Sequence, residues 1–380
     1  MWLIRSHTIA QQVLQARHQT TQAGFTAEAI PKGVFRHHPI LISDGPLHDE
    51  QRKEVGRFFS PRTVTGQYSV LMRSTAARLI AQARIRGFCD IDRVALHYSV
   101  EVTRGVVGLE HSSVRGMSSR LVRFFRQPQF DITRAGLGRN RRQWATAAVN
   151  GLLPILHFWT ADVRPSVRAL RKAPGDNVIS HLIQHDYSNL DILIECVTYG
   201  TAGMVTTREF IAMALWHLLD EDQLRGKYLA ADQNERLEIL EEILRLEPVV
   251  GHLYRRVREA VTVTESAQSW TLRPGDLVDI YVRETNTDST VVGANPLSVC
   301  PKRTRAPGVD RAGLSFSDGA HKCPGKFLAV AETEVFITAL LQEHPTLVTA
   351  PKLTWDHLIA GYQLRGMRVN FPGSEHRNPR

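Results

Sequence analysis

Apolar residues recur at three- and four-residue spacing over most of the chain, which predicts a mainly helical protein. Seven stretches bounded by Pro, Gly, Asp or Asn show this spacing: 65–83, 114–126, 142–159, 162–172, 191–219, 235–246 and 326–343. Strand-like segments are few and come late, at 261–264, at 277–282 and in a hairpin between residues 353 and 371. The pattern therefore predicts a mainly α fold with small β-sheets.

Composition favours one soluble folded domain. Of the 380 residues 43% are apolar and 22% are charged, and no repeat or long linker divides the chain. We expect one domain over residues 1–372 and a disordered polar tail over 373–380. The sequence has no window of 18 apolar residues, and its first residues are too short for a signal peptide, so we expect a cytoplasmic protein without a membrane anchor. The four cysteines lie far apart, which argues against a disulfide framework or a cysteine-based zinc site.

The most informative segment is residues 316–325, Phe-Ser-Asp-Gly-Ala-His-Lys-Cys-Pro-Gly, which precedes a predicted helix. Gly319 and Gly325 permit tight turns that bring amide N–H groups close to a sulfur atom. Cys323 would lie at the positive end of the following helix, which favours a thiolate that can ligate a metal. The alternative is a buried structural cysteine in a glycine-rich turn.

This decapeptide resembles the haem-binding loop of the cytochrome P-450 family. The resemblance implies that Cys323 is the thiolate ligand of the iron in haem b (iron protoporphyrin IX), whose chemistry such a ligand tunes toward O–O cleavage. It also implies that His321 reaches a haem propionate and that Phe316 packs beside the thiolate. The expected fold is then a single cytochrome P-450-like domain.

Other segments resemble family motifs in the expected order. Glu242 and Arg245 match E-x-x-R, and i, i+3 spacing lets them form a structural ion pair on one helical face. Arg255 matches an arginine that binds a propionate, with Arg256 as the alternative register. His48 and Arg52, within Asp-Gly-Pro-Leu-His-x-x-x-Arg, share one helical face and are also expected to bind a propionate; the alternative is a solvated face.

The predicted helix 191–219 contains Ala-Gly-Met-Val-Thr-Thr, which is similar to the family's A-G-x-[DE]-T-T at the distal side of the haem. The resemblance assigns Ala202, Gly203 and Thr206 to the oxygen-binding groove. Gly203 would leave room for dioxygen, and the Thr206 hydroxyl would bond the carbonyl four residues back. The alternative is a threonine-rich turn in the core.

The chain departs from the family pattern at three places. Val205 stands where the family has an acid that helps to deliver protons, so water or a substrate hydroxyl would have to pass protons instead. Residues 284–289 match the family's Ala-Asn-Arg-Asp-Pro turn only loosely. Trp2 aligns with a strand that normally follows 40–50 residues, so the first helix and an edge strand are expected to be missing.

The resemblance implies an oxidoreductase that takes electrons from a redox partner, activates dioxygen and oxidises a small organic molecule, as in natural-product biosynthesis. Val205, Val249 and Val250 are expected to line the substrate pocket. One alternative is one-electron coupling, desaturation or peroxide-driven chemistry, which the missing acid would favour. Another is a non-catalytic haem-binding or carrier-docking protein.

Charge suggests the partners. The net charge is 47 − 38 = +9, and six basic residues lie in 301–326 around Cys323, which would steer an acidic ferredoxin or flavodoxin toward the haem. Eight arginines lie in 115–142, the family's lid over the substrate entrance, and suggest an anionic or carrier-tethered substrate. Solvated surfaces are the alternative for both runs. We expect no nucleic-acid partner, because no binding module is present.

Overall fold

The computed structural model describes residues 1–24 and 35–373. The expectation of a disordered tail after residue 373 therefore lies outside the described residues.

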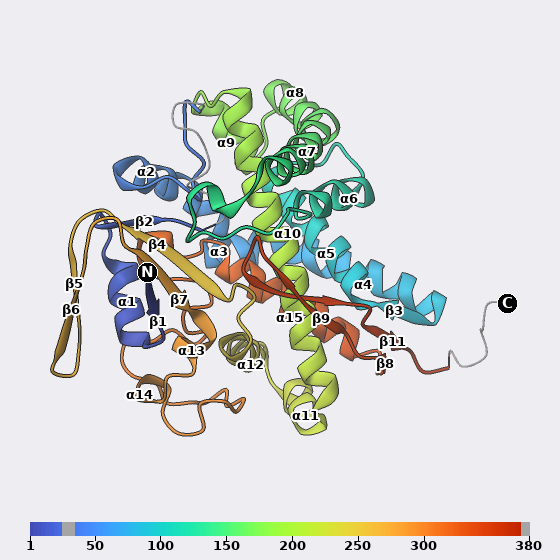
Figure 1. Cartoon of the computed structure of the whole chain (residues 1–380). Coiled ribbons are helices and arrows are strands. Elements are labelled where there is room, and N and C mark those ends of the chain that lie inside the picture. Colours follow the sequence, from blue (N-terminus) through green and yellow to red (C-terminus); the bar gives the residue numbers. More distant parts are fainter. Residues whose placement is uncertain (25–34, 374–380) are drawn as a thin grey trace.

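Helices dominate the described chain, and strands gather at two sides of the molecule (Figure 1). The helices are α1 (His7–Gln15), α2 (Gly45–Val55), α3 (Pro61–Thr63), α4 (Ser69–Arg86), α5 (Ile91–Val107), α6 (Val114–Phe124), α7 (Arg141–Phe158), α8 (Arg164–Lys172), α9 (Val178–Gln184), α10 (Asn189–Asp220), α11 (Asp222–Ala230), α12 (Gln233–Leu246), α13 (Val282–Asn286), α14 (Ser289–Val292) and α15 (Lys326–Leu341). Single turns of other helix types are η2 (Gly56–Phe59), η3 (Val64–Tyr68), η4 (Ala135–Gly138), η5 (Trp159–Val163) and η6 (Gly319–His321).

The strands form small sheets at the edges of the helical body. One sheet has the order β1-β7-β4-β2, with β1 parallel to β7 and the other pairs antiparallel. A second has the order β3-β11-β8, and two hairpins are formed by β5–β6 and β9–β10. The strands are β1 (Trp2–Ile4), β2 (Thr20–Gln22), β3 (Phe88–Asp90), β4 (His252–Val257), β5 (Val261–Glu265), β6 (Gln268–Leu272), β7 (Leu277–Tyr281), β8 (Thr346–Thr349), β9 (Lys352–Asp356), β10 (Gly361–Arg365) and β11 (Arg368–Asn370).

Helix α10 is the centre of the fold and runs through the middle of the molecule (Figure 1). It packs most extensively against α5 and also contacts α15, α11 and α12. Most of its side chains are buried, as expected of a helix that is apolar on nearly all sides. Because neighbouring helices pack against it along most of its length, α10 is a rigid element that can position a ligand beside it.

The sequence patterns predict the mainly α fold with small sheets correctly, in a single domain. The long helices fall within a few residues of their predicted bounds. The exception is the stretch predicted over 65–83: residues 64–68 form a π-helical turn, and α4 starts only at Ser69. Helix α5 was not predicted, because its core-facing positions carry Val, Thr and Ser, which favour helices weakly. Among the residues described, we find no helix with the length and apolarity that a membrane crossing requires.

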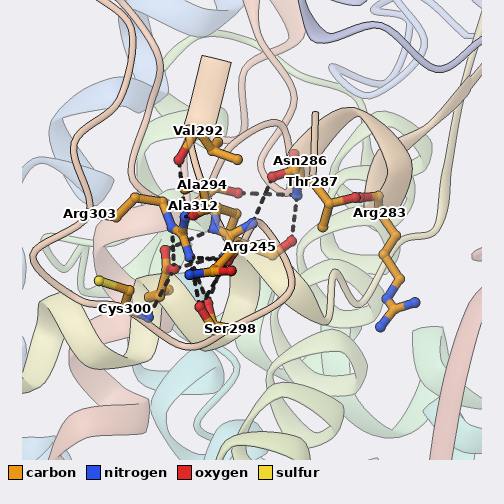
Figure 2. Close-up of polar contacts among 12 residues, drawn as sticks. Arg245, Arg283, Asn286, Thr287, Val292, Ala294, Ser298, Cys300, Arg303 and Ala312 are labelled. Carbon is orange, nitrogen blue, oxygen red and sulfur yellow. Dashed lines mark hydrogen bonds and ion pairs between the residues drawn. The ribbon is translucent and has the colours of Figure 1, made fainter. Parts of the chain in front are cut away.

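A buried ionic network joins α12 to the chain that follows β7. The Glu242 carboxylate accepts two hydrogen bonds from Arg245, both at 2.8 Å, and one from Nε of Arg303 at 2.9 Å. Arg303 also donates to the carbonyls of Val292, Ala294 and Ser298, toward which Figure 2 shows it pointing. All three ionic side chains are at most 7% exposed. The network thus fixes the loops between β7 and Cys323 against α12.

Asn286 extends this network. Its amide nitrogen donates to the carbonyl of Arg245, and its amide oxygen accepts from the backbone of Leu314. Arg245 in turn donates to the carbonyl of Asn286 at 2.8 Å (Figure 2). The segment that matches the family turn only loosely in sequence is therefore held by reciprocal hydrogen bonds.

Glu242→Gln should lower the free energy of unfolding by about 3–5 kcal/mol, because it leaves two buried guanidinium groups without their counter-charge. Glu238→Gln is the matched control on the same helix: its partner Arg311 is 46% exposed, so its loss should cost less than about 1 kcal/mol. Chemical unfolding of both variants measures the difference. Equal losses would contradict the role given to the network.

Candidate active site

The Cys323 loop folds as a tight turn at the start of α15. The backbone N–H of Cys323 donates to the carbonyl of Phe316 at 2.8 Å, which closes the loop. Gly319 has φ +65°, and a Cβ there would lie 2.0 Å from the Leu14 carbonyl oxygen, so only glycine fits. The backbone amides of Gly325 and Lys326 donate to the Cys323 thiol. The turn thus aims two N–H groups at the sulfur, as the sequence predicted.

The Cys323 side chain faces an interior space. The side chain is exposed, although protein surrounds it closely enough that burial raises the pKa of the thiol. The two facts agree if the sulfur lines a cavity inside the protein. The amides of Gly325 and Lys326 and the charge of Arg52 oppose this rise without reversing it. A metal cation would hold the thiolate form.

Two arginines beside the loop form no ion pair with any residue that the structure describes, although the charge of Asp44 acts on Arg255. Arg255 on β4 is 2% exposed and donates to Gln22, to the Tyr254 carbonyl and to Ser317. Within the described residues it has no ion pair, and burial lowers its pKa to about 10. Arg52 on α2 donates to the Lys322 carbonyl at 2.6 Å. A buried guanidinium without an anion is costly, so this pair favours an anionic ligand.

Two histidines lie against each other next to these arginines. The rings of His48 on α2 and His321 on η6 are 4.3 Å apart, and His321 is 3.0 Å from the Asp44 carboxylate. Burial, followed by the charges of His321 and Arg52, lowers the pKa of His48 to about 4. His48 is therefore neutral at pH 7. Asp44, which orients His321, had no predicted role, although it begins the motif that contains His48.

One face of α10 is accessible in the middle of the fold. Ala202 is exposed although it lies in the middle of a mostly buried helix, and Thr206, one turn later, is partly exposed. The Thr206 hydroxyl donates to the Ala202 carbonyl at 2.5 Å, as predicted from the sequence. Val205, which lies between Ala202 and Thr206 in the sequence, is only 1% exposed. The face that bears Ala202 and Thr206 is thus free to meet a ligand.

Gly203 faces a different neighbour from the one that the sequence suggested. A Cβ on Gly203 would lie 2.8 Å from the hydroxyl oxygen of Thr103 on α5. That hydroxyl is buried and has no hydrogen-bond partner among the described residues. The glycine therefore lets α5 and α10 approach closely, and this contact, rather than room for dioxygen, explains the missing side chain.

Two cavities adjoin the turn between β9 and β10. One, of about 230 Å³, lies beside β4 and is lined by Tyr254, Phe130 and Trp355, among others. The second, of about 290 Å³, is lined by Val205, Arg208, Phe125 and Trp355, among others. Val205 lines the second of these cavities, whereas Val249 and Val250 line neither of the two.

These observations fit a haem. The accessible thiol supplies a ligand for its iron, and the two arginines and two histidines supply the charge and hydrogen bonds that its propionates need. Phe316, half-buried beside the thiol loop, packs against the core and lies 5.9 Å from the Lys326 ammonium. The residues therefore match the cofactor by chemistry as well as by motif.

Comparison with known proteins gives the same family. The model of the family "Cytochrome P450" matches residues 237–353. Cytochrome P450 130 of Mycobacterium tuberculosis is 26% identical over 89% of this chain and 79% of its own length. Erythromycin C-12 hydroxylase of Saccharopolyspora erythraea is 27% identical over 90% of this chain and 81% of its own. Over about nine-tenths of its length, the chain is similar to cytochrome P450 proteins.

The solved structures agree in fold. P450BioI, in a complex with an acyl carrier protein that bears hexadec-9Z-enoic acid, matches with a TM-score of 0.76 and 20% identity over 97% of this chain and 92% of its own. The enzyme class comes from the relatives in sequence, which are P450 enzymes: they indicate a P450 monooxygenase or oxidase with a haem-iron cofactor, whose class of chemistry is haem-thiolate oxidation.

The basic run around the thiolate is largely neutralised by α12. Within the described chain, five of its six basic residues form ion pairs, and four of these pairs use acids of α12. The pairs are Lys302–Glu235, Arg303–Glu242, Arg311–Glu238, Lys326–Glu241 and Lys322–Asp310. The positive potential on this side of the P450 is therefore weaker than the sequence count suggested.

Gly203→Ala should lower the free energy of unfolding by about 1–3 kcal/mol, because the added methyl meets a stiff β-branched side chain. The gain in helix propensity, about 1 kcal/mol, offsets only part of this cost. Thr103→Ala in the same chain should restore most of the loss, which a double-mutant cycle measures. Strictly additive effects would contradict the contact between α5 and α10.

Proposed function

We propose that this P450 binds haem b through Cys323 and uses electrons from a redox partner to oxidise a small organic molecule with dioxygen. The observation that carries the proposal is the accessible Cys323 thiol, which faces an interior space and receives two backbone N–H groups. Erythromycin C-12 hydroxylase, a relative of similar length, supports a role in natural-product biosynthesis.

When bound, the haem supplies the iron at which dioxygen is reduced. The amides of Gly325 and Lys326 stabilise negative charge on the Cys323 sulfur and so moderate how strongly it donates. Arg52, Arg255, His48 and His321 orient the cofactor by its propionates and balance their charge. Because these four residues would hold the propionates, the accessible face of α10 would remain free for dioxygen and substrate.

Thr206 is the proton-handling residue that this proposal assigns to the distal side. Its hydroxyl, held by the Ala202 carbonyl, can accept a proton from water and present one toward the accessible face of α10. Val205 offers no carboxyl, so protons have to reach Thr206 through water or a substrate hydroxyl. This arrangement favours hydroxylation that is slower than in relatives with the acid.

The missing acid also supports a second candidate: one-electron coupling, desaturation or peroxide-driven oxidation by the same haem. Val205 is the specific observation that favours it, because these reactions depend less on directed proton delivery. The two candidates share every cofactor-binding residue and differ in whether an oxygen atom from dioxygen reaches the product.

For the partners, we propose an acidic ferredoxin or flavodoxin as electron donor and an anionic or carrier-tethered substrate. Of the lid arginines, Arg120 is held by Asp162, and Arg139 packs over Phe130 and Trp144. Arg141 and Arg142 at the start of α7 are exposed. The P450BioI complex with an acyl carrier protein is a precedent for a tethered substrate.

The test is turnover under isotopically labelled dioxygen. The haem-loaded protein is first screened with free and carrier-linked acids for the spectral shift of substrate binding. With a surrogate ferredoxin system, hydroxylation should transfer one labelled atom to product, and Thr206→Ala should reduce product formed per electron consumed by roughly tenfold. Unlabelled coupled or desaturated product would favour the second candidate. Failure of both electrons and peroxide to give product would refute both.

Arg255→Gln should reduce haem retention, because it removes the buried positive charge that faces the propionates. We expect haem transfer to apomyoglobin at least tenfold faster than from the unaltered protein. Arg256→Gln on the same strand is the control for register and should leave the transfer rate unchanged. The opposite result would place the propionate contact at Arg256.

A further inference from the structure

Outside the haem site, two histidines and a glutamate converge where α9 meets α2 (Figure 1). His181 and His185 are one helical turn apart, so they share a face of α9 and its C-terminal cap. Glu54, near the end of α2, lies opposite them. The three ligand atoms all lie within 4.8 Å of one another. The mechanism described above uses none of these residues.

The buried member of the group lacks a partner. His181 is 6% exposed, and its Nε2 atom has no hydrogen-bond partner among the described residues. An oxygen of Glu54 lies 3.6 Å from Nε2, close enough for an ion pair with a protonated ring but too far for a hydrogen bond. An unsatisfied ring nitrogen at such a buried position is uncommon and points to a missing ligand.

The second histidine is oriented as a metal ligand would be. Nδ1 of His185 lies 2.9 Å from the His181 carbonyl oxygen, which can only accept, so Nδ1 carries the proton. In the neutral ring, Nε2 then has a free lone pair, and it points toward Glu54 at 3.8 Å. A backbone carbonyl that fixes the tautomer of a histidine is a common outer contact in metal sites.

We propose that Glu54, His181 and His185 form a binding site for a divalent transition-metal ion, with Zn²⁺ as the best match. Two imidazole nitrogens and one carboxylate oxygen are ligands that zinc prefers, at about 2.0–2.2 Å each. Tetrahedral ligands at these lengths lie roughly 3.4 Å apart. Here the two Nε2 atoms lie 3.6 and 3.8 Å from different oxygens of Glu54, and the three ligand atoms lie within 4.8 Å of one another, so the side chains have to draw closer around an ion. His185 is 43% exposed, which leaves access for the ion and for water as a fourth ligand.

A bound ion would join α9 to α2, the helix that also carries His48 and Arg52. Because α9 leads into α10 through a short turn, the ion would connect α2 with the start of α10. Zinc should therefore stabilise the fold in proportion to its affinity.

The test uses the haem-loaded protein without a polyhistidine tag. After dialysis against buffered Zn²⁺, zinc and iron are measured in the same sample, so that iron counts the folded molecules. We expect one zinc per iron, a melting temperature raised by about 2–4 °C at saturation, and zinc absorption spectra with imidazole and no sulfur.

His181→Ala and Glu54→Gln should each weaken zinc binding at least tenfold while haem content stays unchanged. His157→Ala, an exposed histidine on α7, and Cys300→Ser, an exposed thiol, are the controls and should bind zinc normally. Zinc binding that survives both site variants, sulfur ligands in the absorption spectrum, or no binding at all would overturn the proposal.

Discussion

A single sulfur atom at the start of α15 determines how the surrounding chain has to be arranged. A thiolate inside a protein needs donors and positive charge, and α2, β4 and the Cys323 loop each bring one of these to the same place. The backbone amides of Gly325 and Lys326 reach the sulfur, while Arg52 and Arg255 remain without carboxylate partners among the described residues. These costs are offset only when an anionic, metal-containing cofactor is present. The Glu242 network then keeps the loops beneath the sulfur in place.

Helix α10 is arranged so that it can meet the cofactor that the Cys323 thiolate would bind. Its far side is packed against α5 so closely that Gly203 admits no side chain, whereas Ala202 and Thr206 remain accessible. A rigid helix with one open face holds a hydroxyl at a defined position without a mobile lid. Replacing the acid of the family pattern with Val205, which is buried, removes a proton donor but leaves this geometry intact. The change therefore affects proton delivery more than it affects the fold.

The sequence predicted the parts of this arrangement that depend on local spacing. The glycines around Cys323, the i, i+4 bond from Thr206 to Ala202 and the i, i+3 pair of Glu242 and Arg245 are set by turns and helical geometry. It could not predict features that depend on segments far apart in the chain. Examples are the contact between Gly203 and Thr103 and the pairing of basic residues near Cys323 with the acids of α12. Glu54 and His181 likewise meet only once α2 and α9 have packed together.

The most direct measurement of the central claim is the absorption spectrum of the reduced carbonyl complex of the haem-loaded protein, recorded with and without Cys323→Ser. The unaltered protein should show the long-wavelength band of a thiolate-ligated haem. The variant should lose that band yet still bind haem, because Arg52, Arg255, His48 and His321 remain. A band that is the same in both proteins, or one typical of imidazole ligation in the unaltered protein, would contradict ligation by Cys323.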